Sequence, residues 1–452
     1  MVRNGLPGER RPVHTRHGLD RETEARLAEL GRQLPPLSEE EARSIAADRA
    51  AWLKRRLAVG LVVAVVVAVV AGAMVQWFRP LAQPALQGLA TGISVPGTAP
   101  RLPWPSTGEA ALSLPGLGSL GQDRDIRPVP IGVLSGVLTA YVILKDHPLS
   151  TGGDTGPTIA VTPQTMAAYR AGSAAGEPEV RVSSGESLTE LDALEGLLID
   201  SGNDMATLLA DWDAGSTSAF VTKMDLSALS LGLRHTHITE PSGADDAVIS
   251  TPSDLIRLAE AAMRIPVFQQ VVSLGEVTLP EAGLQYNSNF VLGENGVVGI
   301  EAGSDTIANG CYLFAAQKIV SGRTVTLYGA VLGQSGPNGP VTAAVDAGDA
   351  LMKAALSDVT AVPILQAGRV VGQLSAPWGA STPVMVSQAV TVPAWPGLRV
   401  SVTARLVTLS VPVATGTRVG SLEIHQGSRV IEVALHNTAP LQGPSGLWRL
   451  TR

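Results

Sequence analysis

The feature that most constrains this chain is an apolar run between Arg56 and Arg79. Its 22 residues, LAVGLVVAVVVAVVAGAMVQWF, include no charged side chain. As a helix the run would be roughly 33 Å long, enough to cross the hydrocarbon core of a bilayer. We therefore predict a single transmembrane helix over residues 57–78. A cleaved signal peptide is the alternative, but the polar segment ahead of the run and the run itself are both too long for one.

The charges around this run predict its orientation. Residues 1–56 hold 12 basic and 9 acidic side chains and end in the triplet KRR, whereas only Arg79 and Arg101 follow the run closely. Because basic segments next to a spanning helix stay in the cytoplasm, we expect a cytoplasmic tail over residues 1–56. The C-terminal bulk of the chain is then extracytoplasmic, held at the cell membrane by a single-pass anchor.

Two short patterns describe the flanks of the run. Ser38 and Glu41 have the spacing of a capping box, which predicts that a helix starts in the tail and continues into the membrane. The tail is therefore expected to be partly helical, and mixed charge on such a helix is typical of a solvated face. Residues 79–106 contain six prolines among Gly, Ser and Thr. They are expected to form a Pro-rich linker.

The composition of the chain excludes several function classes. The net charge of -7 is spread along the sequence without a basic block in the soluble part, so no nucleic-acid partner is expected. Cys311 is the only cysteine, which rules out an intramolecular disulfide and a cage of several cysteines around a metal. Only five of the 33 basic residues are lysines, a bias common in high-GC genomes, including those of actinobacteria.

Hydrophobic periodicity divides the rest of the chain into two parts. Between residues 107 and 357, helical stretches such as PSDLIRLAEAAMRI alternate with strand-like runs such as TVTLYGAVLG. This mixture predicts an α/β (α+β) domain with an antiparallel sheet flanked by helices. Residues 361–452 instead carry alternating runs and turn residues without a helical stretch, which predicts a small all-β C-terminal domain.

Three ordered stretches of the first domain resemble a known family. PIGVLSGVLTAYVILKD, then SGN at Ser201 to Asn203, then GIEAG at residues 299–303, are similar to the penicillin-binding serine DD-peptidases. The resemblance is to the D-alanyl-D-alanine carboxypeptidase branch, with a β-lactamase-like fold. It implies three motifs: S-x-x-K at the start of a helix, S-x-N on a loop and K-T-G on a strand.

The chain departs from the family at most of the motif positions. The resemblance places the nucleophilic serine at Val133 and the general-base lysine at Gly136, and neither residue can attack a carbonyl or take a proton. Ser201 and Asn203 match the second motif. The third motif supplies the family's substrate-binding positions, which here are Glu301, Ala302 and Gly303. Glu301 replaces the lysine and Ala302 replaces the threonine, so only the glycine is kept.

These replacements oppose both chemistry and substrate binding. A serine hydrolase that loses its nucleophile slows by about 10⁶. A carboxylate at Glu301 would repel the terminal carboxylate of a peptide by roughly 4 kcal/mol at about 4 Å and an effective dielectric near 20. The nearest other hydroxyl, on Ser135, lies roughly 200° around the helix from the nucleophile position, and Leu138 stands where its base would be needed.

A metal site was considered because histidine and acidic side chains cluster after residue 234. The cluster lacks an H-E-x-x-H spacing or a cysteine pair, and a similar turn occurs in the family without a metal, so we predict no metal and no cofactor. The residues concerned are His235, His237, Glu240, Asp245 and Asp246.

Three functions remain open on sequence alone. The first is a pseudoenzyme: a membrane-anchored homologue of D-alanyl-D-alanine carboxypeptidase that binds or regulates in the cell envelope, with peptidoglycan stem peptides or cell-wall synthesis proteins as partners. The second is an active serine-type D-Ala-D-Ala carboxypeptidase with a rerouted site, acting in peptidoglycan remodelling. The third is a cleft for another ligand, cationic because Glu301 reverses a family charge.

Overall fold

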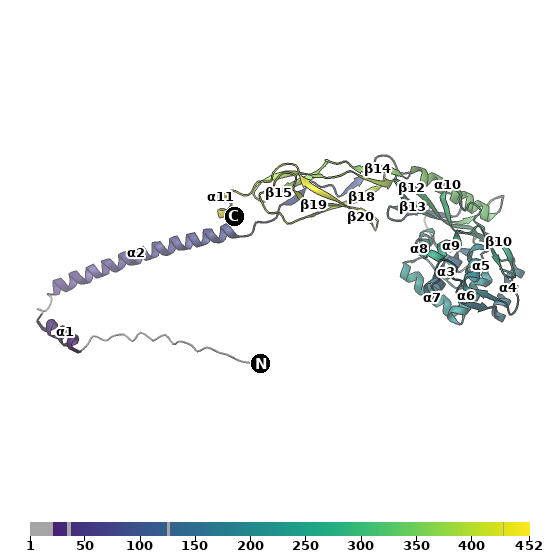
Figure 1. The fold of residues 1–452 in the computed structure, drawn as a ribbon, viewed down its shortest axis with the longest axis horizontal. Helices are drawn as coiled ribbons and strands as arrows, with labels where there is room; N and C mark the ends of the chain where they lie inside the picture. Colours follow the sequence, from purple (N-terminus) through teal and green to yellow (C-terminus); the bar gives the residue numbers. More distant parts are fainter. Residues whose placement is uncertain (1–20, 34–37, 124–126, 428) are drawn as a thin grey trace, which may run out of the picture. The chain divides into compact units, whose positions relative to one another are not determined.

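The structure is a computed structural model that describes residues 21–33, 38–123, 127–427 and 429–452. The chain divides into two compact units. One comprises Met1–Leu81 together with Pro444–Arg452, and the other comprises Ala82–Gly443 (Figure 1). Of the expected cytoplasmic tail, residues 1–20 and 34–37 lie outside the described part of the chain.

The first unit is built on one long helix. After α1 (Arg21–Gln33), helix α2 (Glu39–Phe78) begins at the predicted capping box, where Glu41 N donates to Ser38 Oγ over 3.3 Å. Ser38 N in turn donates to a carboxylate oxygen of Glu41 over 3.1 Å. The helix continues without a break through the apolar run and ends just before Pro80, which lacks a backbone donor. By length and composition α2 is able to cross a membrane.

A short C-terminal helix, α11 (Gly446–Thr451), packs against the end of α2. Gln76 Nε2 donates to Arg452 O over 2.8 Å. This helix differs from the all-β prediction for residues 361–452. The sequence reason is local, because Ser445 caps the helix by accepting from Trp448 N over 3.2 Å.

The second unit contains an antiparallel sheet with helices on both faces, as predicted. Its strand order is β11-β12-β13-β3-β4. Helix α10 packs on β12 and β13, and α8 packs on β13 and β3. Figure 1 shows α10 on one side of β12 and β13 and the group α3, α5, α6 and α7 on the other. The bounds are β3 (Glu109–Leu114), β4 (Gly118–Asp123), β11 (Val297–Asp305), β12 (Asn309–Val320), β13 (Arg323–Gln334), α8 (Pro252–Ala262) and α10 (Pro340–Asp358).

Alternation along β12 explains how this sheet is buried on both faces. Successive side chains of a strand point to opposite faces. Leu313 accordingly belongs to the hydrophobic cluster on the helical side, while Tyr312 and Phe314 belong to the cluster that includes α10. The strand therefore reads as a continuous apolar run, since neither face meets water.

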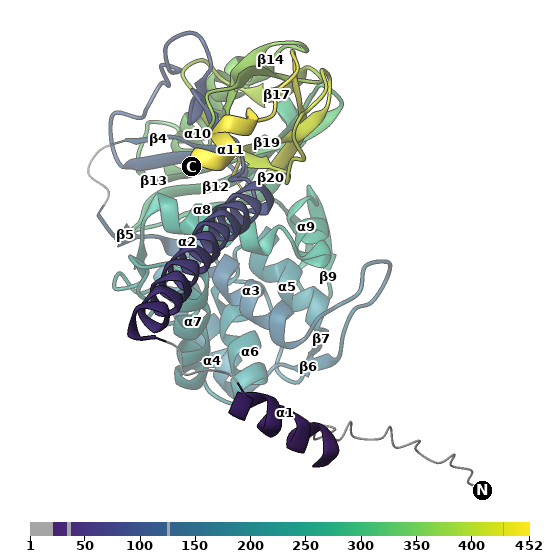
Figure 2. The ribbon, with the colours of Figure 1, turned by 90° about the vertical axis from the view of Figure 1, so that its left-hand side faces the viewer.

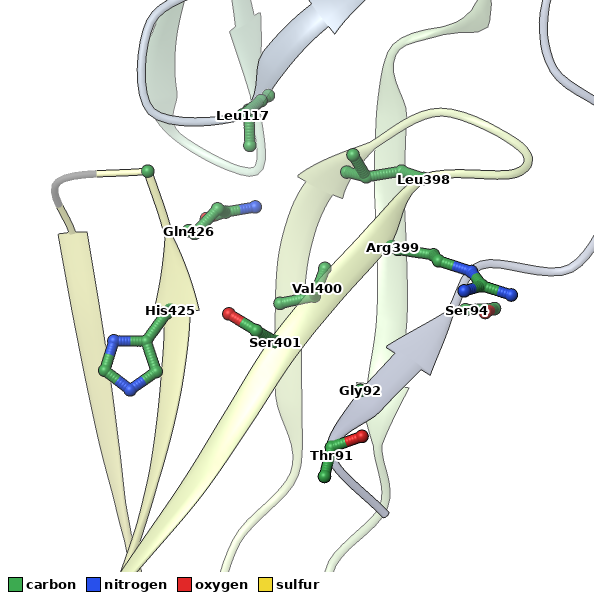
Figure 3. Close-up of a pocket in the computed structure, with 11 residues that line it drawn as sticks. Thr91, Gly92, Ser94, Leu117, Leu398, Arg399, Val400, Ser401, His425 and Gln426 are labelled. Carbon is green, nitrogen blue, oxygen red and sulfur yellow. The ribbon is translucent and has the colours of Figure 1, made fainter.

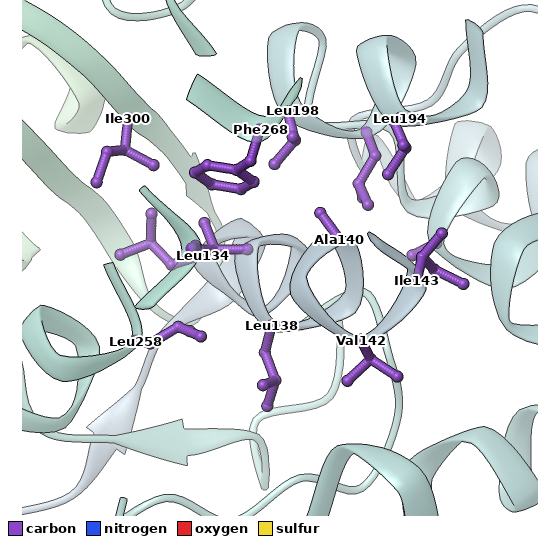
Figure 4. Close-up of a cluster of buried hydrophobic side chains, with 14 of the residues drawn as sticks. Leu134, Leu138, Ala140, Val142, Ile143, Leu194, Leu198, Leu258, Phe268 and Ile300 are labelled. Carbon is purple, nitrogen blue, oxygen red and sulfur yellow. The ribbon is translucent and has the colours of Figure 1, made fainter. Parts of the chain in front are cut away.

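Helix α3 (Ser135–Asp146) is the centre of the helical part. Figure 2 shows it surrounded by α5, α6, α7, α8 and α9. Leu134 of η1 and the α3 side chains Leu138 and Ile143 belong to one buried apolar cluster with Leu198 of α5 and Phe268 of α9 (Figure 4). The remaining elements of this part are η1 (Gly132–Leu134), α4 (Pro163–Ala175), α5 (Glu190–Ile199), α6 (Asn203–Ala214), α7 (Thr217–Leu231), α9 (Pro266–Val272) and η2 (Glu294–Gly296), with the strand pairs β5 (Val129–Pro130) and β8 (Ile249–Ser250), β6 (Thr158–Ala160) and β7 (Ser187–Thr189), and β9 (Glu276–Leu279) and β10 (Gly283–Tyr286).

The strand-rich region contains a larger antiparallel sheet in the order β1-β15-β16-β20-β19-β18-β2. A separate antiparallel pair is formed by β14, which follows α10 in the sequence, and β17. The bounds are β14 (Thr360–Leu365), β15 (Val370–Ser375), β16 (Ser381–Val386), β17 (Val390–Ala394), β18 (Arg399–Leu406), β19 (Arg418–Gln426) and β20 (Arg429–Asn437).

Two findings differ from the predicted linker and the predicted separate β-domain. The segment expected to be a spacer supplies both edge strands of the large sheet, β1 (Ala85–Gln87) and β2 (Gly92–Ser94). Prolines are compatible with edge strands, so a Pro-rich composition did not exclude this. A single hydrophobic cluster also runs from α10 and β12 into the strand-rich region, which places residues 82–443 in one compact unit.

Candidate functional site

The first motif lies where the chain enters α3. Val133 belongs to the 3-10 turn η1, and Gly136 lies one helical turn later, on α3. Both are buried, and Val133 is only 5% exposed. The structure therefore puts an isopropyl group and a bare hydrogen where the family resemblance places a nucleophile and its base.

The second motif forms the connection between α5 and α6. The two helices are separated there, because Ser201 adopts a left-handed backbone conformation with φ of 58°. Gly202 N donates to Gly196 O over 3.1 Å, and Asn203 N donates to Pro178 O over 3.0 Å. These bonds hold the loop so that the Ser201 hydroxyl points toward β11, where it meets Glu301.

The third motif lies on β11, paired with β12. Glu301 is opposite Leu313 and Gly303 is opposite Cys311, so both lie on the helical face of the sheet. Ala302 is opposite Tyr312 and belongs to the cluster on the α10 face. Only Glu301 and Gly303 of this motif thus face the first two motifs.

The three motifs converge, as their order in the family implies. A Cβ atom placed on Gly303 would lie 2.5 Å from Val133 Cγ2 and 3.6 Å from Ser201 Oγ. One placed on Gly136 would lie 3.8 Å from Glu301 Oε1. We name these seven positions the motif cluster: Val133, Gly136, Ser201, Asn203, Glu301, Ala302 and Gly303.

Glu301 is the unusual member of the motif cluster. Its side chain is 1% exposed, and its Oε1 accepts a hydrogen bond from Ser201 Oγ over 3.3 Å. Its other oxygen has no hydrogen-bond partner among the described residues. Burial raises the pKa of Glu301 well above its ordinary value, and the Ser201 bond opposes this only in part.

This burial changes the electrostatic expectation. From the sequence, a charged Glu301 is expected to repel the terminal carboxylate of a peptide. In the structure the carboxyl is enclosed and favours its neutral form, so direct repulsion of a bound anion is not its main effect. Its bulk instead lies beside Gly136, in the space that a longer side chain at that position would enter.

The motif cluster is closed by its own side chains. Every one of the seven residues is buried. The Val133 side chain contacts Gly303 so closely that a side chain at position 303 would clash with it. The resemblance implies that this glycine exists so that substrate approaches the strand, and here a methyl group covers it.

Other nucleophiles near the motif cluster are also enclosed. Ser135 is fully buried, and its hydroxyl has no hydrogen-bond partner among the described residues. Cys311 lies opposite Gly303 and is 1% exposed. Burial raises the pKa of the Cys311 thiol to about 12, so it stays protonated at neutral pH and is a poor nucleophile.

One feature next to the motif cluster was missed by sequence reasoning. Asp204 follows the second motif, and its backbone N donates to Glu179 Oε2 over 2.9 Å. Asp204 Oδ1 accepts from Val180 N over 3.0 Å, which ties the segment before β7 to the loop. Burial raises the pKa of Glu179, and the neighbouring Asp204 carboxylate raises it further. Nothing in the sequence pairs two carboxyls so far apart.

The acidic and histidine cluster considered for a metal forms a turn instead. Ser242 N and Gly243 N both donate to the Glu240 carboxylate, the first over 2.7 Å. Asp245 accepts from Thr239 Oγ1 over 2.8 Å. Within the described ranges, no group of three or more His, Cys, Asp or Glu side chains is arranged to hold a metal ion.

The strand-rich region contains a cavity of about 540 Å³ where β18 and β19 stop pairing (Figure 3). Its lining includes Arg399 and His425 but no member of the motif cluster. In Figure 3 the Arg399 side chain extends toward Ser94. His425 Nε2 is already within 2.7 Å of Thr403 Oγ1. The lining thus offers no set of groups converging on a ligand.

Comparison with known proteins agrees with this geometry. The profile of the D-alanyl-D-alanine carboxypeptidase family matches residues 122–334. A D-alanyl-D-alanine carboxypeptidase of Mycobacterium tuberculosis is 33% identical over 163 residues, which cover 35% of this chain and 51% of the relative. One from a Streptomyces species is 33% identical over 158 residues, covering 31% of this chain and 54% of the relative.

The chain thus spans about half the length of the curated relatives it matches. A solved structure, penicillin binding protein 5 from Haemophilus influenzae, matches 77% of this chain and all of its own length, with a TM-score of 0.53 and 17% identity. At that identity the likeness speaks to the fold alone. Residues 122–334 therefore form a domain that is similar to the D-alanyl-D-alanine carboxypeptidase family, the same serine DD-peptidase family that the three motifs resemble.

Proposed function

We propose that the protein is a membrane-anchored, catalytically inactive homologue of the D-alanyl-D-alanine carboxypeptidases that acts in the cell envelope by binding or regulation. The observation that carries this proposal is the contact of Val133 with Gly303, beside a buried Glu301 carboxyl. This arrangement lacks a nucleophile and leaves no open path to one.

The chemical part of the proposal rests on the first motif. Acyl transfer to a serine requires a hydroxyl and a group that takes its proton. Val133 and Gly136 provide neither, and the retained hydroxyl of Ser201 donates to a carboxyl that favours its neutral form. A neutral carboxyl is a weak base, so Ser201 is not activated either.

The alternative function, an active carboxypeptidase with a rerouted site, needs a substitute nucleophile. Ser135 and Cys311 are the nearest candidates, and both are enclosed by surrounding side chains. A peptide ending in D-Ala-D-Ala would have to displace core residues to reach either. No observation on the described residues favours this alternative or a cationic ligand at Glu301.

The envelope location is the second part of the proposal. Helix α2 is long and apolar enough to span a bilayer, and basic residues precede its apolar part. We infer that residues 1–56 are cytoplasmic and that residues 82–443 lie outside. There the domain would meet peptidoglycan stem peptides and cell-wall synthesis proteins through surfaces other than the motif cluster.

Labelling of the purified full chain with a fluorescent penicillin tests the catalytic part. We expect no covalent adduct and no release of terminal D-alanine from a D-Ala-D-Ala peptide. An active carboxypeptidase of the family, treated in parallel, controls for the reagents, and circular dichroism confirms that the protein is folded. A stoichiometric adduct on any serine would overturn the proposal.

A further inference from the structure

The region where α11 meets α2 gathers aromatic and cationic side chains at one end of the apolar run. Trp77 and Phe78 end α2, and Trp448 lies on α11. Arg449 stands 5.7 Å from the centre of the Trp77 ring, and Arg452 stands 5.4 Å from that of Trp448. Amphipathic aromatic rings and arginines of this kind are typical of the boundary between hydrocarbon and headgroups.

The arginines also cap the spanning helix. The last carbonyls of a helix have no partner within it, and leaving them unpaired near hydrocarbon is costly. Arg449 Nη1 donates to Trp77 O over 3.2 Å, and Arg452 Nη2 donates to Gln76 O over 3.4 Å and also to Arg79 O. Cations at this position also complement the helix dipole. These hydrogen bonds hold α11 against the C-terminal end of α2.

The outward side of α11 is apolar. Leu447 is 73% exposed and Leu450 is 43% exposed, on a helix whose other side holds the arginine contacts to α2. Six residues are too few for a stable helix in water without a packing partner. The last turn of α2 also exposes an apolar side chain, since Phe78 is 80% exposed.

The charged side chains around this surface have one sign. Arg79, Arg449 and Arg452 are its charged residues, and neither 57–108 nor 433–452 contains an aspartate or glutamate. Each guanidinium carries more donors than the carbonyls of α2 use. An anionic headgroup with phosphate oxygens complements these arginines, while acyl chains accommodate the leucines.

We propose that α11 is an interfacial helix that caps the external end of the spanning helix and binds anionic phospholipid headgroups of the outer leaflet. This inference rests on the proposed membrane anchor. It adds a second, charge-dependent membrane contact formed by a segment remote in sequence from the span.

Site-directed fluorescence on the full chain in lipid nanodiscs tests the proposal. In a Cys311→Ala background, Leu447→Cys and, separately, Val66→Cys receive an environment-sensitive label. The discs contain phosphatidylglycerol and phosphatidylcholine in equal parts, or phosphatidylcholine alone, with nitroxide-bearing lipids as quenchers. Position 66 lies within the apolar run and reports on spanning independently of α11.

We expect headgroup-level quenchers to quench the label at position 447 in the anionic discs and chain-centre quenchers to quench the label at position 66 in both kinds. Arg449→Gln with Arg452→Gln lowers the ratio of docked to free α11 in anionic discs by roughly fivefold for each arginine that contacts a headgroup. Added salt is expected to lower the same ratio in the protein that keeps both arginines, because salt screens their attraction to anionic headgroups.

The outcomes separate the two proposals. If the label at position 66 is quenched but that at position 447 is not, the interfacial role of α11 is wrong and the membrane anchor stands. If neither label is quenched, the membrane anchor itself is wrong. Equal quenching at position 447 in both kinds of disc, unchanged by the arginine substitutions, refutes the binding of anionic headgroups.

Discussion

The body of helix α3 and the turn η1 that leads into it differ in how far they match the DD-peptidase family. The body of α3 packs Leu138 and Ile143 into a dense apolar core, whereas its entry holds Val133 and Gly136 where the family resemblance places catalytic groups. The difference teaches that the fold depends on buried area and the chemistry on a few polar atoms. The first can persist after the second is lost.

Restoring the lost groups is the strongest way to break this comparison. We expect Val133→Ser with Gly136→Lys, Glu301→Lys and Ala302→Thr to acquire penicillin acylation that the parent lacks. Loss of a nucleophile in a serine hydrolase costs about 10⁶ in rate, so even a small part of that would be detectable. The measurement is the fluorescent adduct, located by mass spectrometry at position 133.

The matched control for restoration keeps Val133 and carries the other three substitutions. It is expected to fold equally well and to remain unlabelled. Leu197 Cδ1 would lie 3.0 Å from a new Cβ at position 136, so a small shift of the Leu197 side chain is required. A folded variant with all four changes that never acylates would mean that the site has diverged beyond its motifs.

Truncating the core is the reverse experiment. Phe268 is fully buried against α3, and Phe268→Ala is expected to lower the free energy of unfolding by about 3–5 kcal/mol. Leu229→Ala is the control, because Leu229 is 72% exposed on α7 and its loss is expected to change stability by less than about 0.5 kcal/mol. Urea unfolding of residues 82–443 measures both, and equal effects would contradict the assigned core.

The smallest expected effect concerns Glu301. Because burial raises its pKa, the folded protein keeps a proton there that the unfolded chain releases, so stability falls as pH rises above the ordinary carboxyl range. Glu301→Gln has no such proton, and we expect its melting temperature at about pH 8 to exceed that of the parent by about 2–4 °C. The gain disappears at a pH below the ordinary carboxyl pKa.

Thermal unfolding across a pH series measures this difference. The exposed Glu276 provides the control, since Glu276→Gln removes a carboxyl that is open to water. A Glu301→Gln profile parallel to that of the parent would show that Glu301 is ionised in the folded protein, and the account of its burial would be wrong.

Sequence reasoning reached the features that depend on local pattern. The capping box at Ser38 and the α/β fold with an antiparallel sheet are confirmed, because spacing and alternation encode them directly. The contact of Val133 with Gly303 was not predicted, because the order of the motifs along the chain does not say which side chains touch. The burial of Glu301 could not be foreseen, since it depends on how the loop at Ser201 folds over β11.

The pairing of distant segments was also beyond local pattern. Strand β1 pairs with β15, and α11 packs on α2, contacts between residues more than two hundred positions apart. Short segments of three to six residues carry too little periodicity to predict such partners. The contact between Glu179 and Asp204 could not be predicted for the same reason. The two residues are distant in sequence, and the raised pKa of Glu179 comes mainly from its burial in the folded protein.

The carboxyl of Glu301 beside Gly136 has a consequence for the history of the protein. A lone Gly136→Lys change would push a new chain toward an occupied space, while a lone Val133→Ser change would gain a hydroxyl without a base. If the proposed loss of catalysis is right, no single reversion improves on the present arrangement, and selection for the family's reaction has no first step to favour.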